Sequence, residues 1–320
     1  MNILVTGCAG FIGSSLVDFL LLHDHKIIGI DNFDPFYPKE IKQKNLSNAL
    51  KNPSFTFYQL NISNGLSVIA EKIDVVIHMA AKAGVRPSIE NPLGYIETNI
   101  HGTQEVLNFM KERGIKKLVF ASSSSVYGNN KKIPFSESDP VDNPISPYAS
   151  TKKSAELLTY TYHHLYKIDV INLRFFTVYG PRQRPDLAIY KFVRKILNDE
   201  EIILFGDGKS ARDYTFIDDI LTGVYNAMNY SIDHTNIFET VNLGNNLPVK
   251  LNDLVSLLGE ITGKKIISQN TGMQPGDVDI TYADISRAQT LFHYKPAVTI
   301  KEGLKKFVEW YTVTVHDHPV

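Results

Sequence analysis

Short apolar runs alternate with amphipathic stretches along the first half of the chain. Most of the apolar runs are rich in β-branched residues and apolar on both faces, which is typical of strands buried in a parallel sheet. The predicted strands are Ile3–Thr6, Lys26–Ile30, Thr56–Tyr58, Val75–His78, Lys117–Ala121 and Val170–Arg174. The amphipathic stretches between them predict helices over Phe11–Leu22, Gly94–Arg113 and Tyr148–Tyr166. This repeated order of strand and helix favours an α/β fold with a doubly wound parallel sheet.

The pattern changes after Arg174. Prolines and the run Gly206-Asp207-Gly208 divide this part into loops and shorter elements. Helices are predicted at Ala188–Asn198, Ile217–Asn229, Leu251–Thr262 and Ile300–Tyr311. We therefore expect a first domain over residues 1–178, which also includes about 215–243. A smaller, discontinuous mixed α/β domain within 179–320 is expected to complete a cleft.

Composition excludes several classes of partner. The chain has 320 residues and 43% hydrophobic content, enough to bury a large core. Lys and Arg total 33 against 34 Asp and Glu, so no basic field attracts a nucleic acid. A single cysteine, Cys8, favours a reducing compartment. With no signal peptide and no run of about 18 apolar residues, we expect a soluble cytoplasmic protein without a membrane partner.

A glycine-rich loop follows the first predicted strand and leads into the first predicted helix. It reads Thr6-Gly7-Cys8-Ala9-Gly10-Phe11-Ile12-Gly13. Glycines at this spacing let the backbone approach a pyrophosphate, and the helix N-terminus supplies free N–H groups. Asp31 ends the second strand, where a carboxylate can hold ribose hydroxyls and would repel a 2′-phosphate. The pattern predicts a dinucleotide site that prefers NAD to NADP.

A second candidate site combines a tyrosine, a lysine and a serine run. Tyr148 and Lys152 are four residues apart on one predicted helix, so they share a helix face. A cationic lysine favours the phenolate, which makes the tyrosine a candidate general base. The fifth strand ends in Ser122-Ser123-Ser124-Ser125, at the sheet edge where ligands bind in open α/β folds. A serine there can bond the oxygen that the tyrosine deprotonates. No His, Cys or Asp set has convincing metal spacing.

Nearly the whole chain, from Ile3 to about Trp310, resembles the extended short-chain dehydrogenases of the nucleotide-sugar epimerase/dehydratase family. The residues that carry the resemblance are the Gly7–Gly13 loop, Asp31-Asn32, His78-Met79-Ala80-Ala81, Gly84-Val85-Arg86, Asn99, the serine run, Tyr148 with Lys152, and Arg174–Pro181. It implies a Rossmann-type NAD-binding domain and a UDP-sugar-binding domain. It also implies a catalytic triad of Ser123, Tyr148 and Lys152, with Ser122 and Ser124 as neighbouring alternatives for the hydroxyl.

The same resemblance implies a set of residues around the cofactor. They are Gly7, Gly10, Phe11, Ile12, Gly13, Asp31, Asn32, Asn61, Ile62, Ala80, Ala81, Asn99, Ser122, Tyr148, Lys152, Phe175 and Val178. Asn61 departs from the family pattern, because many relatives carry an acidic residue there. Its amide can still accept and donate hydrogen bonds near the adenine.

The resemblance also narrows the reaction. Dehydratases of the family place an Asp-Glu pair after the strand-end hydroxyl, whereas this chain has Ser124 and Ser125. Decarboxylating relatives place a glutamate near that hydroxyl, and none lies in the serine run. Epimerisation at C4 through a transient ketone needs neither acid and is the favoured reaction. A protein that only senses dinucleotides is disfavoured, because such proteins tend to lose the Tyr/Lys pair.

The stretch Thr177–Ala188 resembles UDP-glucuronate 4-epimerases, in which the counterparts of Thr177 and Arg184 lie beside the C6 carboxylate of the sugar. An arginine matches a carboxylate with two hydrogen bonds. Alternatively, Arg182 and Arg184 are exposed cations or phosphate contacts, and UDP-glucose or UDP-N-acetylglucosamine is the substrate. The resemblance further implies substrate contacts at Arg86, Ser123, Lys191, Arg212 and Asp277. It also implies a homodimer that forms a four-helix bundle through Gly94–Arg113 and Tyr148–Tyr166.

Overall fold

The computed structural model describes residues 1–272 and 278–316. Its largest unit is a seven-stranded parallel sheet in the order β10-β6-β5-β4-β1-β2-β3. The strands are β1 (Asn2–Thr6), β2 (Lys26–Asp31), β3 (Phe55–Gln59), β4 (Val75–His78), β5 (Lys117–Ser123), β6 (Asp169–Phe175) and β10 (Phe238–Leu243). The six strands predicted from the apolar runs are confirmed. The edge strand β10 is not predicted, because Glu239, Thr240 and Asn242 interrupt its apolar pattern.

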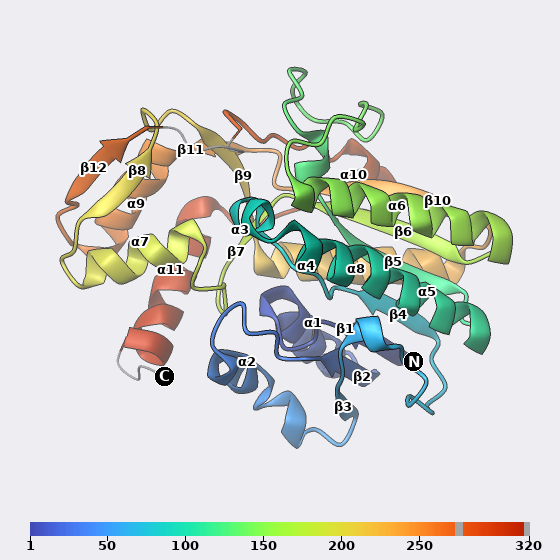
Figure 1. Cartoon of the computed structure of the whole chain (residues 1–320). Coiled ribbons are helices and arrows are strands. Elements are labelled where there is room, and N and C mark those ends of the chain that lie inside the picture. The colour runs from blue at the N-terminus through green and yellow to red at the C-terminus, as the bar shows by residue number, and fades with distance from the viewer. Residues whose placement is uncertain (273–277, 317–320) are drawn as a thin grey trace.

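Helices cover both faces of this sheet (Figure 1). Alternate strand residues such as Leu4 and Val76 pack with α5 (Gly102–Arg113) and α6 (Pro147–Tyr166). Their neighbours Ile3 and Val75 pack with α1 (Phe11–Leu22) and α8 (Ile217–Asp233). The first layer also includes α3 (Val85–Glu90), α4 (Pro92–Ile96) and a π-helical turn at Glu97–His101. The helix predicted over Gly94–Arg113 is therefore continuous and contains this π-helical turn between α4 and α5. The doubly wound α/β prediction is therefore confirmed.

A smaller unit with mixed strand directions lies beside the sheet, on the left in Figure 1. Its strands form a three-stranded sheet, β11-β9-β7, and a two-stranded sheet, β12-β8. These strands are β7 (Thr177–Tyr179), β8 (Ile202–Phe205), β9 (Ala211–Phe216), β11 (Pro248–Lys250) and β12 (Ser268–Thr271). Three helices pack around them: α7 (Ala188–Leu197), α9 (Leu251–Thr262) and α11 (Ile300–Tyr311). The boundary at residue 178 remains a prediction.

The remaining elements are short. They are α2 (Lys39–Leu46), α10 (Ser286–Phe292), 3-10 turns at Ala49–Lys51, Ile62–Asn64 and Ser124–Tyr127, and a π-helical turn at Thr312–His316. Within the part of the chain that the structure describes, every helix is too short or too polar to cross a lipid bilayer.

The strand order places the candidate residues at one edge. Strand β1 pairs with β2 on one side and with β4 on the other, so the chain direction across the sheet reverses between β1 and β4. Ligands of open α/β sheets bind at such a reversal, beyond the carboxyl ends of the strands. Thr6, Asp31, His78 and Ser123 lie at these ends.

Candidate active site

The glycine loop between β1 and α1 is packed too closely for side chains. Gly7 has a φ of +69°, and a Cβ there would lie 2.8 Å from the backbone nitrogen of Ala80. A Cβ on Gly13 would lie 2.1 Å from the carbonyl oxygen of Gly7. Gly10 is the N-cap of α1 and brings no side chain to the first turn. The first N–H groups of α1 are thus left for an anion such as a pyrophosphate.

Asp31 is fixed at the end of β2 by backbone donors. Its Oδ2 accepts a hydrogen bond from the Ala9 N–H at 3.1 Å, and its Oδ1 accepts one from the Phe33 N–H at 2.8 Å. Burial raises the pKa of this carboxyl, while the nearby Lys42 ammonium and the two backbone donors oppose the rise. The charged carboxylate suits ribose hydroxyls and disfavours a 2′-phosphate.

A cavity extends from the glycine loop to Tyr148. Fifteen of the predicted cofactor residues line it: Gly7, Gly10, Phe11, Ile12, Gly13, Asp31, Asn32, Asn61, Ile62, Ala80, Ala81, Ser122, Tyr148, Lys152 and Phe175. Two predicted residues do not line the cavity. Val178 is buried in strand β7. Asn99 is buried behind the wall, where its Oδ1 accepts from the Lys82 N–H at 2.8 Å and its Nδ2 donates to the Lys82 carbonyl at 2.9 Å. The lining therefore fits a dinucleotide, with Asn99 supporting the wall.

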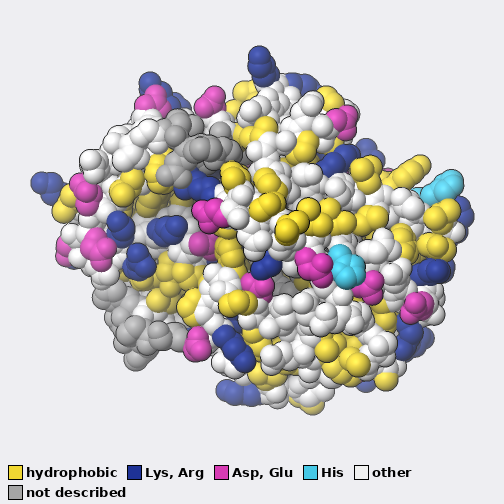
Figure 2. Space-filling view, in the orientation of Figure 1, with side chains coloured by type: hydrophobic (Ala, Val, Ile, Leu, Met, Phe, Trp, Pro, Cys, Tyr) yellow, Lys and Arg dark blue, Asp and Glu magenta, His cyan; other side chains and the backbone are white. Residues whose placement is uncertain are grey.

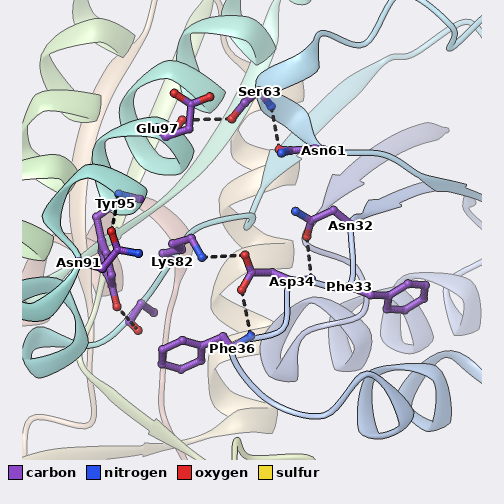
Figure 3. Close-up of polar contacts among 12 residues, drawn as sticks. Asn32, Phe33, Asp34, Phe36, Asn61, Ser63, Lys82, Asn91, Tyr95 and Glu97 are labelled. Atoms are coloured by element: carbon purple, nitrogen blue, oxygen red, sulfur yellow. Dashed lines mark hydrogen bonds and ion pairs between the residues drawn. The ribbon is translucent and has the colours of Figure 1, made fainter.

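An ion pair that the sequence analysis missed joins two loops of this cavity. Lys82 follows β4, Asp34 follows β2, and Lys82 Nζ lies 2.7 Å from Asp34 Oδ2 (Figure 3). Asp34 also accepts a hydrogen bond from the Phe36 N–H, and Lys42 Nζ donates to the Asp34 carbonyl at 2.8 Å. Because Asp34 and Lys82 are 48 residues apart, no local pattern indicates the pair.

Helix α6 presents Tyr148 and Lys152 to the end of β5. The Ser146 side chain caps the helix by accepting from the Ala149 N–H at 3.1 Å. Lys152 Nζ donates to the Ala121 carbonyl at 2.7 Å and lies 5.1 Å from the Phe120 ring centroid. Burial lowers the pKa of Lys152 to about 7, against the opposing effect of Glu156. Burial raises the pKa of Tyr148 above its usual value, and a hydrogen bond with Ser123 and the charge of Arg184 only partly oppose this rise.

This geometry allows acid-base chemistry at one oxygen atom. The Ser123 side chain lies close enough to Tyr148 to lower its pKa, so both can reach a single substrate hydroxyl. Lys152 lies one helical turn from Tyr148, where its positive charge favours the phenolate. The structure thus brings the three predicted triad residues together. The three side chains thus form a candidate acid-base group at this position.

A second cavity lies beyond the serine run. It is lined by Val85, Ser124, Ser125, Gly128, Phe135, Ile145, Ser146, Thr177, Arg212, Val278 and Thr281. Of the predicted substrate residues that the structure describes, Thr177 and Arg212 line this cavity. Arg86 stacks on the Phe205 ring at 4.7 Å, and Lys191 is exposed on α7. Asp277 lies outside the described residues.

Arg184 occupies an unexpected position. It lines the cofactor cavity, whereas Thr177 lines the second cavity. Its Nε and Nη2 donate to the Asp186 carboxylate at 2.9 and 2.7 Å. Asp186 is only two residues away, but nothing in the sequence pattern indicates this pairing. Arg182 is also not an exposed cation, because its Nη2 lies 2.6 Å from Asp18 on α1.

Comparisons with known proteins agree with this site. Residues 4–307 match the model of the family described as GDP-mannose 4,6 dehydratase. A UDP-glucuronate 4-epimerase of Thermodesulfobacterium geofontis is 45% identical, with 96% of this chain and 95% of that protein aligned. The crystal structure of UDP-glucuronic acid 4-epimerase from Bacillus cereus with UDP-glucuronic acid and NAD is 38% identical with a TM-score of 0.94, covering 98% of this chain and 100% of that one.

A third relative has a different substrate. UDP-N-acetylglucosamine 4-epimerase from Methanobrevibacter ruminantium is 32% identical with a TM-score of 0.90, and 98% of this chain and 99% of that chain are covered.

Proposed function

The chain belongs to the GDP-mannose 4,6 dehydratase family, and on this premise we propose that it is an NAD-dependent epimerase that inverts C4 of UDP-glucuronate. The observation that favours epimerisation over the reaction in the family's name is the composition of the second cavity. Among its described lining residues, Ser124 and Ser125 follow the strand-end Ser123, and no carboxylate is present. An acid and a base for removal of water from the sugar are thus missing from this wall.

The chain's own residues account for the proton transfers. Ser123 holds the C4 oxygen, and the Tyr148 phenolate takes the proton of the C4 hydroxyl. Lys152 stabilises the phenolate with its positive charge. NAD, held by the glycine loop and Asp31, would supply the hydride acceptor and donor needed at C4. Tyr148 then gives the proton back, so no net acid or base is consumed.

The second cavity and its rim are the proposed site of the UDP-sugar. Thr177, Ser124 and Ser125 present hydroxyl groups, and Arg212 adds a positive charge beside them. Arg86 and Lys191 lie outside its lining, and we propose that they contact the diphosphate. The deciding experiment incubates the enzyme with UDP-glucuronate, UDP-glucose and UDP-N-acetylglucosamine and determines the C4 configuration by NMR. Faster inversion of a neutral sugar would overturn the uronate assignment and leave the epimerase assignment intact.

Cofactor recycling gives a prediction that distinguishes an epimerase from a dehydrogenase. An epimerase regenerates NAD in every cycle, so product should form without net accumulation of NADH. The Asp34–Lys82 ion pair, which joins two loops of the cavity, and the buried Asp31 favour retention of the dinucleotide during purification. Absorbance of NADH during turnover checks this. A stoichiometric rise in NADH would contradict the epimerase mechanism.

A homodimer through α4, α5 and α6 is also part of the proposal, together with a cytoplasmic location. Exposed apolar side chains gather over this face, as Figure 2 shows, and include Leu93, Ile96, Leu157, Tyr160 and Leu165. Their spacing on α6 places Leu157, Tyr160 and Leu165 on one side of the helix. Two such faces can pack as a four-helix bundle.

Introducing a charge on this face should separate the protomers. We expect Leu157→Lys to shift the protein from dimer to monomer in light scattering, because burial of a leucine contributes about 1.5–3 kcal/mol and a symmetric interface contains it twice. Leu22→Lys, on the opposite side of the sheet and 82% exposed, is the control and should leave the dimer intact. A monomeric wild type, or a dimer unaffected by Leu157→Lys, would overturn the interface.

A further inference from the structure

Helix α6 is attached to the end of β5 at three successive turns. Tyr148 lies beside Ser123, whose side chain lowers its pKa, and Lys152 donates to the Ala121 carbonyl. One turn further, the Glu156 carboxylate accepts a hydrogen bond from Ser122 Oγ at 2.6 Å. Ser122, which makes the third contact, lies between Ala121 and Ser123 on the strand. Ser122, expected to contact the cofactor, lines the cavity and points its hydroxyl at Glu156.

Glu156 is a buried charge with a complete set of partners. Its side chain is 5% exposed, and Arg174 on β6 donates to it twice, both times at 2.9 Å. Arg174 is 4% exposed and continues the network to the Tyr127 hydroxyl at 3.1 Å. Two buried charges are costly to desolvate, and replacing such a pair by apolar residues is often neutral or stabilising. Stability alone therefore does not explain a charged group at this position.

We propose that Glu156 is a positioning residue for the reaction, which fixes the end of β5 against α6 through Ser122 and places a negative charge one helical turn from Lys152. This inference rests on the proposed roles of Tyr148 and Lys152. Glu156 and Lys152 are one helical turn apart on the same buried face. Because a nearby carboxylate favours the charged ammonium, loss of Glu156 weakens the charge that stabilises the Tyr148 phenolate.

The other charged and titratable groups near Lys152 do not replace this contribution. His78 on β4 is buried and neutral, since burial lowers its pKa to about 3 and the Lys152 charge adds to the effect. Lys153, 3.9 Å from Glu156, is a cation, as is Arg174. Burial lowers the pKa of Lys152 to about 7, and Glu156 is the charge that raises it. The Lys152 ammonium therefore depends on Glu156 near neutral pH.

The test is the pH dependence of Glu156→Gln in the NAD-bound protein. Without the carboxylate, and with Arg174 left unpaired, Lys152 should lose its proton at lower pH, so the alkaline limb of kcat should move down by about one pH unit. The Tyr148 phenolate, followed as the ultraviolet difference from Tyr148→Phe, should form at higher pH. Glu156→Asp keeps the charge and should restore both midpoints.

A matched variant separates this role from a structural one. Asp169 is a buried carboxylate at the opposite end of β6, paired with Lys117 at 2.9 Å. Asp169→Asn should reduce stability without moving either midpoint. Unmoved midpoints in Glu156→Gln, or equal shifts in Asp169→Asn, would overturn the proposal.

Ser122→Ala tests the contact with β5 if Glu156→Gln does not fold. Loss of the Ser122–Glu156 hydrogen bond should lower kcat a few-fold. Because the variant retains the Glu156 carboxylate, the pH profile should be unchanged. An unchanged kcat would overturn the positioning role. The phenolate titration needs only NAD, so it tests Glu156 even if the wild type fails to convert UDP-glucuronate, a failure that would count against the proposed function instead.

Discussion

Tyr148→Phe is expected to lower kcat at least about 100-fold, the lower end for loss of a general base. The phenylalanine keeps the ring on α6 and its edge-to-face contact with Tyr95, whose centroid lies 6.2 Å away. The variant removes only the hydroxyl, whose pKa the neighbouring Ser123 lowers. We therefore expect the melting temperature and the affinity for NAD to stay close to those of the wild type.

Single-turnover measurements with bound NAD separate this loss from a defect in binding. They record the reduction of the bound cofactor directly, and the rate of that step should fall with kcat. Tyr95→Phe is the matched control, because the Tyr95 hydroxyl donates to the Ala83 carbonyl at 3.1 Å, away from the triad. Near-normal turnover by Tyr148→Phe would show that another group is the base.

The sheet was predictable because its strands are apolar on both faces. The shorter strands of the smaller unit lack this signal. Strand β12 is polar and exposed throughout, and β9 contains Asp213, which is fully buried. The Asp213 carboxylate is held by three backbone donors, the N–H groups of Asn245, Asn246 and Ala283. Only tertiary structure supplies these partners, so hydrophobic periodicity could not identify the strand.

The site also contains residues that the sequence predicts and residues that it does not. The glycine loop and the Tyr148–Lys152 pair have fixed local spacing, and the position of Ser123 at a strand end brings it to them. The Asp34–Lys82 and Glu156–Arg174 pairs join segments that are distant in sequence. Even a partner close in sequence can be missed, as Arg184 shows. An arginine at this position predicted binding of a substrate carboxylate, and in the structure Arg184 is paired with the carboxylate of Asp186.

Arg184→Ala is expected to lower kcat/KM for UDP-glucuronate by roughly 10- to 100-fold, which corresponds to loss of a charge-assisted hydrogen bond of about 1.5–3 kcal/mol. For Arg184 to bind the C6 carboxylate, the substrate must take the place of Asp186. The guanidinium is available for such an exchange, because it lines the cavity beside Tyr148 and stacks on Phe36 at 5.1 Å. Asp186→Asn should weaken the internal partner and lower the KM for UDP-glucuronate.

The decisive quantity is the ratio between the uronate and UDP-glucose. Arg184 also lowers the pKa of Tyr148, so its removal should slow the reaction of both sugars through the base. That shared loss cancels in the ratio, and the remainder measures recognition of the carboxylate. Arg182→Ala is the control in the same loop, since Arg182 pairs with Asp18 on α1 and should leave the ratio unchanged. Equal losses on both sugars in Arg184→Ala would limit Arg184 to its effect on Tyr148, to the phosphate or to packing. The C6 carboxylate would then be bound by the hydroxyls and Arg212 of the second cavity.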